Sequence, residues 1–274
     1  MIRRALAVTV MVLVAGCSAE TPPAAPVSSV TPVTPPVAPP PVVSPSSAAP
    51  PVTSTPAAEA PVVVLDPGHN GGNAANPAAI NRKVPAGRGR TKPCNTTGTT
   101  TNDGYAEHAF TFDVAQRAGK LLADKGIRVV FTRDDDTSVG PCVDKRAEIG
   151  NSAQAAAVVS IHADGNNSPG ANGFHIAYSA PPLNDAQGEP AAKLTRSLRD
   201  SLRENGFRYS DYLGEEGLSA REDLAGLNLS ERPAALVECG NMRNATEAAR
   251  MSTADGRQQY AAGIAGGILS YLGA

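Results

Sequence analysis

The chain has 274 residues, with 24 Lys and Arg against 26 Asp and Glu, and therefore a formal net charge of −2. Because the charges are nearly balanced and the basic residues are scattered, the composition argues against nucleic acid and against an electrostatically driven membrane partner. Tryptophan is absent and aromatic residues make up 4% of the chain, which disfavours a carbohydrate-binding surface built on stacking.

The first 17 residues are organised like a secretory signal. Arg3 and Arg4 precede an apolar run over residues 5–15, which is too short for an ordinary membrane span. The run ends at Gly16 and Cys17, an arrangement similar to a bacterial lipobox, in which the cysteine is lipidated. We expect an exported protein, either lipid-anchored through Cys17 on the outer face of the cytoplasmic membrane or released into the periplasmic or cell-wall space.

Residues 18–60 consist mainly of Pro, Ala, Val, Ser and Thr, with almost no charge. Such a segment cannot bury enough apolar surface to fold, so a disordered linker is predicted. Residues 61–274 are long enough for one domain with its own core, which we expect to be a monomer.

The domain begins with an apolar run, 62–65, which is typical of a buried strand. Asp66-Pro67-Gly68 then forms a turn and places His69 at the carboxyl end of that strand. Residues 70–104 form a long polar loop, and loops of this length are usually functional or disordered.

Apolar residues spaced three and four apart from Phe110 to Leu122 predict an amphipathic helix with Glu107 in its first turn, ended by Lys125-Gly126. A strand over 127–132 follows. This order of strand, helix and strand favours a parallel sheet with right-handed crossovers.

The same alternation continues to the end of the chain. Helices are predicted over 143–157, 190–205 and 258–272, and strands over 158–162, 173–178 and 233–239. In the strand 173–178, His175 is expected to face outward. The predicted fold class is α/β, with a mostly parallel central sheet flanked by helices on both faces.

Three of the predicted strands end in polar side chains, namely His69, His162 and Glu238, and a helix start offers Glu107. The carboxyl ends of parallel strands share one edge of the sheet, so these side chains should converge. Two imidazoles and one carboxylate, with one position left for water, are typical of a catalytic zinc site, and a further carboxylate could move protons.

The motifs around these residues resemble the zinc-dependent N-acetylmuramoyl-L-alanine amidases. The segments that carry the resemblance are Val63-Val64-Leu65-Asp66-Pro67-Gly68-His69, Ser160-Ile161-His162-Ala163 and Ala235-Leu236-Val237-Glu238-Cys239-Gly240, together with Glu107, Thr132-Arg133-Asp134, Arg146, Asn151, Gly217-Leu218, Arg221 and Asn244. The resemblance implies the same fold class and hydrolysis of the amide between N-acetylmuramic acid and L-alanine, in peptidoglycan or in its fragments.

The resemblance also implies one Zn²⁺ per chain, held by His69, Glu107 and His162, with Glu238 as the catalytic carboxylate. Glu238 would take a proton from the attacking water and deliver it to the leaving amine. His108 is the rival metal ligand, but on a helix it points about 100° away from Glu107.

The chain departs from the family pattern at Asp164, where the family usually has asparagine after His-Ala. Asp164 either contacts a substrate amine or a water, or lies at a solvated surface. Arg221 and Asn228 are further candidates for substrate binding. Residues 163–234 show no obvious extra helix of the kind that blocks the site in activator-dependent family members, so we expect that no activator is required.

Three cysteines lie in the predicted domain. In an oxidising exterior the natural pair is Cys94 with Cys142, while Cys239, in a buried strand, is expected to behave as a small hydrophobic residue. A catalytic role for Cys239 is a poor alternative, because no further histidine partner is evident.

Two other functions remain open from the sequence. One is a peptidoglycan-binding lipoprotein that keeps the fold without turnover. The other is a zinc peptidase that cuts within the stem peptide, because the same metal chemistry cleaves other amides.

Overall fold

The computed structural model describes residues 59–168 and 170–274. The predicted signal, with the lipidation candidate Cys17, lies outside the described residues, as does the predicted linker up to residue 58. Among the helices that the structure describes, none combines the length and the apolar character needed to cross a membrane.

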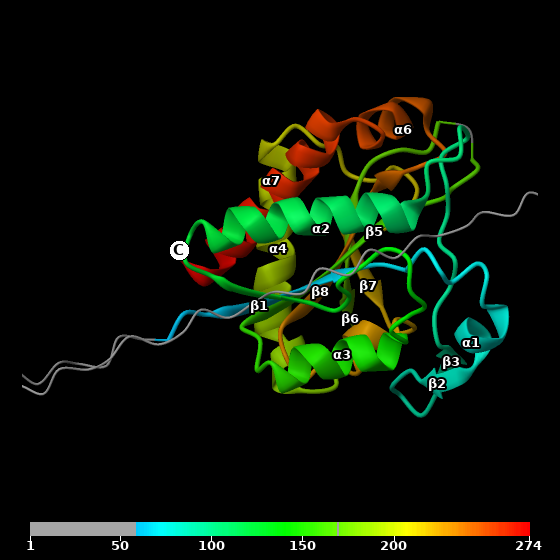
Figure 1. Ribbon diagram of the computed structural model, residues 1–274. Helices are drawn as coiled ribbons and strands as arrows, with labels where there is room; N and C mark the ends of the chain where they lie inside the picture. Colours follow the sequence, from blue (N-terminus) through cyan, green and yellow to red (C-terminus); the bar gives the residue numbers. More distant parts are fainter. Residues whose placement is uncertain (1–58, 169) are drawn as a thin grey trace, which may run out of the picture. The chain divides into compact units, whose positions relative to one another are not determined.

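In the described part of the chain, six strands form the central sheet (Figure 1). They are β1 (Val62–Pro67), β4 (Arg128–Phe131), β5 (Ala157–Asp164), β6 (His175–Ser179), β7 (Leu218–Arg221) and β8 (Ala234–Asn241). Their order across the sheet is β4-β1-β5-β8-β6-β7. Every neighbouring pair is parallel except β6 and β8, so the predicted mostly parallel sheet is confirmed.

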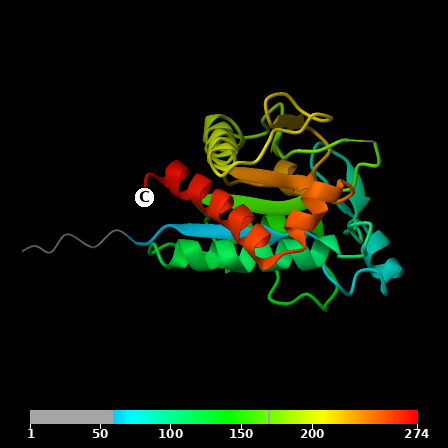
Figure 2. The same ribbon diagram turned by 90° about the horizontal axis from the view of Figure 1, so that it is seen from above.

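Helices cover both faces of the sheet, as predicted. The first face carries α2 (Glu107–Ala123), α4 (Glu189–Glu204) and α7 (Ala254–Leu272), and the second carries α3 (Val143–Ser152) and the short α5 (Ala225–Asn228). Figure 2 views the molecule from the side of α2 and α7. Alternating residues of β1 serve the two faces, since Val63 and Leu65 enter the larger core and Val64 the smaller one.

Two predicted helices differ from the structure at one end. The helix predicted over 143–157 ends at Ser152, because the chain turns through Gln154, in the left-handed region at φ +48°, to begin β5 at Ala157. The last helix begins at Ala254, four residues before the predicted start, since the Thr253 side chain caps its N-terminus by accepting from the backbone N–H of Gly256.

The segment predicted as a long polar loop contains three short elements, and α6 and η1 also lacked a sequence prediction. These elements are α1 (Pro77–Asn81), β2 (Lys83–Pro85), β3 (Thr91–Pro93), η1 (Asp185–Gln187) and α6 (Ala245–Met251). Strands β2 and β3 pair in an antiparallel hairpin. The predicted disulfide between Cys94 and Cys142 is present next to this hairpin, and Cys239 is buried as expected.

Candidate metal centre

The two histidines approach each other at the carboxyl edge of the sheet. His69 follows β1 with φ +60° and is 9% exposed, and His162 lies near the end of β5. Their ring centroids are 4.8 Å apart. Gly68 permits this approach, because a Cβ at that position would lie 2.4 Å from Cε1 of His162.

Glu107, the first residue of α2, places its carboxylate between the two imidazoles. Its Oε1 lies 3.0 Å from Nε2 of His69 and 3.1 Å from Nδ1 of His162. Backbone N–H groups fix the carboxylate, with Thr99 donating to Oε2 at 2.8 Å and Ala163 to Oε1 at 3.1 Å. One ligand atom from each of the three side chains lies within 4.8 Å of the others.

The donor set fits a zinc ion. Glu107 is 4% exposed. Burial raises the pKa of a carboxyl, yet the imidazoles of His69 and His162 outweigh burial and hold the Glu107 pKa well below its usual range. A buried carboxylate that stays ionised between two imidazole nitrogens is a set of ligands that Zn²⁺ prefers, and three protein ligands leave a position open.

Glu238 faces the same groove, a cavity of about 380 Å³ that the three potential ligands, Glu238 and Asp164 all line. In β8 it pairs in register with His162 of β5. Its Oε2 is buried without a hydrogen-bond partner among the described residues. Burial, with the carboxylates of Asp164 and Glu107, raises the pKa of Glu238 well above its usual range.

His175 lies beside this groove, and the prediction that it faces outward is wrong. The residue is 1% exposed, and its Nδ1 lies 3.6 Å from Oδ2 of Asp164, which also accepts a hydrogen bond of 2.8 Å from the Tyr212 hydroxyl. The alternation in the strand was read correctly, but β6 is an interior strand and the Tyr212 ring covers that face. No local sequence signal marks Tyr212 as the partner of a carboxylate 48 residues away.

Two other candidate residues are engaged within the protein. Asn228 is 5% exposed, and its side-chain amide donates to the carbonyl of Ala86 and accepts from Nε of Arg88. Arg221 donates to the Asp223 carboxylate at 2.7 Å. Asn228 therefore connects the β2–β3 hairpin to α5, while Arg221 lies at the end of β7.

His108, the rival ligand, lies outside the converging group. Its Nδ1 is 2.8 Å from Oδ2 of Asp136, and Asp136 is also paired with Arg133. The turn of the helix between Glu107 and His108 separates the two side chains as expected.

Two imidazoles, a buried carboxylate and a neighbouring glutamate at the carboxyl edge of an α/β sheet define the site of a metal-dependent hydrolase. The family model described as N-acetylmuramoyl-L-alanine amidase matches residues 63–270. The chain belongs to this family, which confirms the family, fold and function that the sequence motifs predict. As an amidase of the cell wall, the enzyme acts outside the cytoplasm.

Curated and solved relatives agree with this assignment. The chain is 47% identical over 211 residues to N-acetylmuramoyl-L-alanine amidase Rv3717 of Mycobacterium tuberculosis, a match that covers 77% of this chain and 86% of the relative. The crystal structure of the amidase Ami1 from Mycobacterium smegmatis superimposes with a TM-score of 0.76 at 48% identity, covering 78% of this chain and 98% of that one. Ami1 from Mycobacterium abscessus gives 0.75 at 50% identity, covering 77% and 98%.

Proposed function

We propose that the chain hydrolyses the amide between N-acetylmuramic acid and L-alanine with one Zn²⁺ held by His69, Glu107 and His162. The observation that carries the proposal is the convergence of one ligand atom from each of these side chains within 4.8 Å, at the wall of a groove. Bound there, zinc supplies Lewis acidity toward the scissile carbonyl and the attacking water.

Glu238 carries protons in this proposal. It takes a proton from the attacking water and delivers it to the leaving nitrogen of L-alanine. Its raised pKa supports the role, because a carboxyl that holds a proton near neutral pH can both accept and donate one. Its buried Oε2 supports it too, since that atom lacks a partner among the described residues and lines the groove that substrate must enter.

Asp164 binds a polar group of the substrate in this proposal. Tyr212 and His175 fix one of its oxygens, and the residue lines the groove beside Glu238. Arg221 contributes positive charge near Glu238, whose pKa it lowers against the larger effect of burial. Asn228 acts indirectly, by holding the hairpin that forms one wall of the groove.

The substrate is peptidoglycan or muropeptide fragments, and export by the N-terminal signal brings the enzyme to it. In the lipidated alternative, Cys17 anchors the domain through residues 18–60, which then act as a spacer. Both segments belong to the proposal alone.

The test is Glu238→Gln, assayed on purified protein without any activator. The variant should retain zinc while turnover falls by about 10²–10⁴-fold, because general acid–base help is lost. Glu231→Gln, at an exposed position before β8, is the matched control and should keep the wild-type rate.

Mass analysis of digested muropeptides identifies the bond. Intact stem peptide freed from glycan supports the proposal, whereas shortened peptides would indicate a peptidase and unchanged muropeptides a binding protein. Hydrolysis at the wild-type rate by Glu238→Gln would remove Glu238 from the mechanism.

A further inference from the structure

Residues 94–99, called here the capping segment, lie against two of the proposed zinc ligands. Thr96 places its carbonyl oxygen 3.2 Å and its hydroxyl oxygen 3.1 Å from Nδ1 of His69. Thr99 donates its backbone N–H to Oε2 of Glu107 at 2.8 Å. The orientation of both ligands therefore depends on where the capping segment lies.

The contact with Thr96 decides which nitrogen of His69 is free. A neutral imidazole carries one N–H and one lone pair. With the proton on Nδ1, the N–H donates to the Thr96 oxygens and the lone pair remains on Nε2, the atom that faces Glu107 at 3.0 Å. Partners of this kind orient metal-binding histidines and raise their basicity, so Thr96 is a positioning residue for His69.

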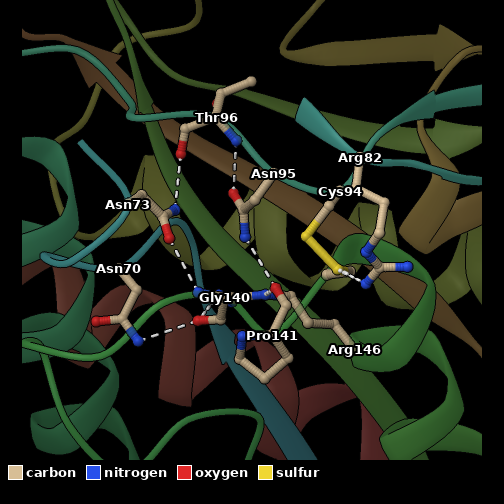
Figure 3. The surroundings of a disulfide bond; sticks show 10 residues. Asn70, Asn73, Arg82, Cys94, Asn95, Thr96, Gly140, Pro141 and Arg146 are labelled. Atoms are coloured by element: carbon tan, nitrogen blue, oxygen red, sulfur yellow. Dashed lines mark hydrogen bonds between the residues drawn. A yellow bond between two sulfur atoms is a disulfide. The ribbon is translucent and has the colours of Figure 1, made fainter. Parts of the chain in front are cut away.

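Two buried asparagines fix Thr96 from opposite sides (Figure 3). Asn73, which is fully buried, donates to the Thr96 carbonyl at 2.8 Å and accepts from the backbone N–H of Gly140 at 2.9 Å. Asn95 accepts from the Thr96 N–H at 2.8 Å and donates to the carbonyl of Pro141 at 2.9 Å. The capping segment is thus bound at Thr96 to the loop that precedes α3.

The disulfide makes the same connection covalently. Cys94 begins the capping segment, and Cys142 directly follows Pro141 and precedes α3. The Cys94 carbonyl also accepts from the backbone N–H of Val143 at 2.8 Å. Arg146 of α3 holds the loop itself, donating to the carbonyls of Gly140 and Pro141. The capping segment and this loop are consequently fixed as one unit.

We propose that the Cys94–Cys142 disulfide, Asn73 and Asn95 form a frame that sets the zinc affinity of the enzyme. The frame holds the capping segment against His69 and Glu107, although none of its own side chains belongs to the proposed ligand set. Without the frame, the two ligands lose fixed partners and must be ordered when the metal binds, which weakens binding. The inference rests on the proposed zinc site.

The test measures zinc affinity of the exported full chain, with its disulfide formed, by competition with a chromophoric chelator. Asn73→Ala should raise the zinc Kd by about 10-fold, the lower end of the usual effect of outer-shell partners. Asn81→Ala, at the exposed end of α1, removes the same side chain where no hydrogen bond of that side chain is found among the described residues. The Kd of this control should equal that of the wild type.

A second variant, Cys94→Ser with Cys142→Ser, should also raise the Kd, and it carries the test if Asn73→Ala does not fold. Substitution replaces chemical reduction here because thiol reductants themselves bind zinc. Circular dichroism and the unfolding midpoint of the zinc-free proteins separate positioning from general stability. Variants that unfold at lower temperature but bind zinc with the wild-type Kd while folded would overturn the inference. A wild-type chain that fails to bind zinc would instead contradict the proposed site.

Discussion

At the scale of single residues, two glycines make the metal site possible. Gly68 lets the His162 ring pack against the turn after β1, and Gly98 lies equally close to the ligands. A Cβ at Gly98, where φ is +78°, would lie 2.8 Å from Oε2 of Glu107 and 3.0 Å from the His69 ring. A side chain at either position would displace a proposed ligand, so the site depends on residues that supply no donor atom.

The ligand assignment predicts different outcomes for two histidines that both lie near Glu107. His162→Ala removes one of three ligands and should cost the protein its stoichiometric zinc, measured by metal analysis after gel filtration. His108→Ala should retain zinc, because the His108 Nδ1 is engaged by Asp136 at 2.8 Å. Full zinc occupancy in His162→Ala, or its loss in His108→Ala alone, would contradict the assignment.

At the scale of elements, the β2–β3 hairpin is held to the body of the protein through its turn. Arg88, at φ +52° between two glycines, donates to the side chains of Asn228 and Ser179 and to the carbonyl of Pro181. Strand β3 contributes Lys92 to the lining of the groove. The arginine therefore fixes one wall of the active site from outside it.

Arg88→Ala should loosen the hairpin while the sheet stays intact. Charge-assisted hydrogen bonds at a partly exposed site contribute about 1 kcal/mol, so amide hydrogen exchange over residues 83–93 should accelerate about 5-fold. Arg90→Ala is the control, since Arg90 pairs with Glu222 where both side chains are more than half exposed. Equal exchange rates in the two variants would show that Arg88 does not anchor the hairpin.

The sequence reveals elements that bury an apolar pattern and hides those that do not. Apolar runs that end in a polar residue predicted the strands carrying His69, His162 and Glu238, and hence the candidate site. The hairpin was missed because its strands have three residues each and only Val84 is buried among them. His175 was misread because burial of a strand face depends on a segment distant in sequence, here the one that carries Tyr212.

At the scale of the whole molecule, one buried carboxylate joins four elements beneath the site. Asp66 of β1 accepts hydrogen bonds from Arg146 of α3, from Thr132 after β4 and from Ser160 of β5, at 2.6 to 2.7 Å. Arg146 also donates to the carbonyl of His69 at 2.7 Å. The second face of the sheet is thus held by a polar network where the first face has its larger apolar core.

This network makes the stability of the fold depend on pH. Burial raises the pKa of Asp66, but the Arg146 charge and the hydrogen bonds from Ser160, Thr132 and Arg146 outweigh it and lower the pKa from 3.8 to about 2. A carboxyl whose pKa is lower in the folded state stabilises that state above its unfolded pKa. The stabilisation, about 2 kcal/mol at neutral pH, is lost as the pH falls from about 4 through about 2.

Asp66→Asn should therefore lower the free energy of unfolding strongly at pH 7 and progressively less at acid pH, because the wild-type carboxyl becomes neutral there as well. Urea unfolding of the zinc-free protein between pH 7 and pH 2 measures the difference without a contribution from metal binding. Asp103→Asn, at an exposed turn, should show a small difference that hardly changes with pH. A difference between wild type and Asp66→Asn that stays constant across this range would mean that Asp66 does not stabilise the fold through its charge.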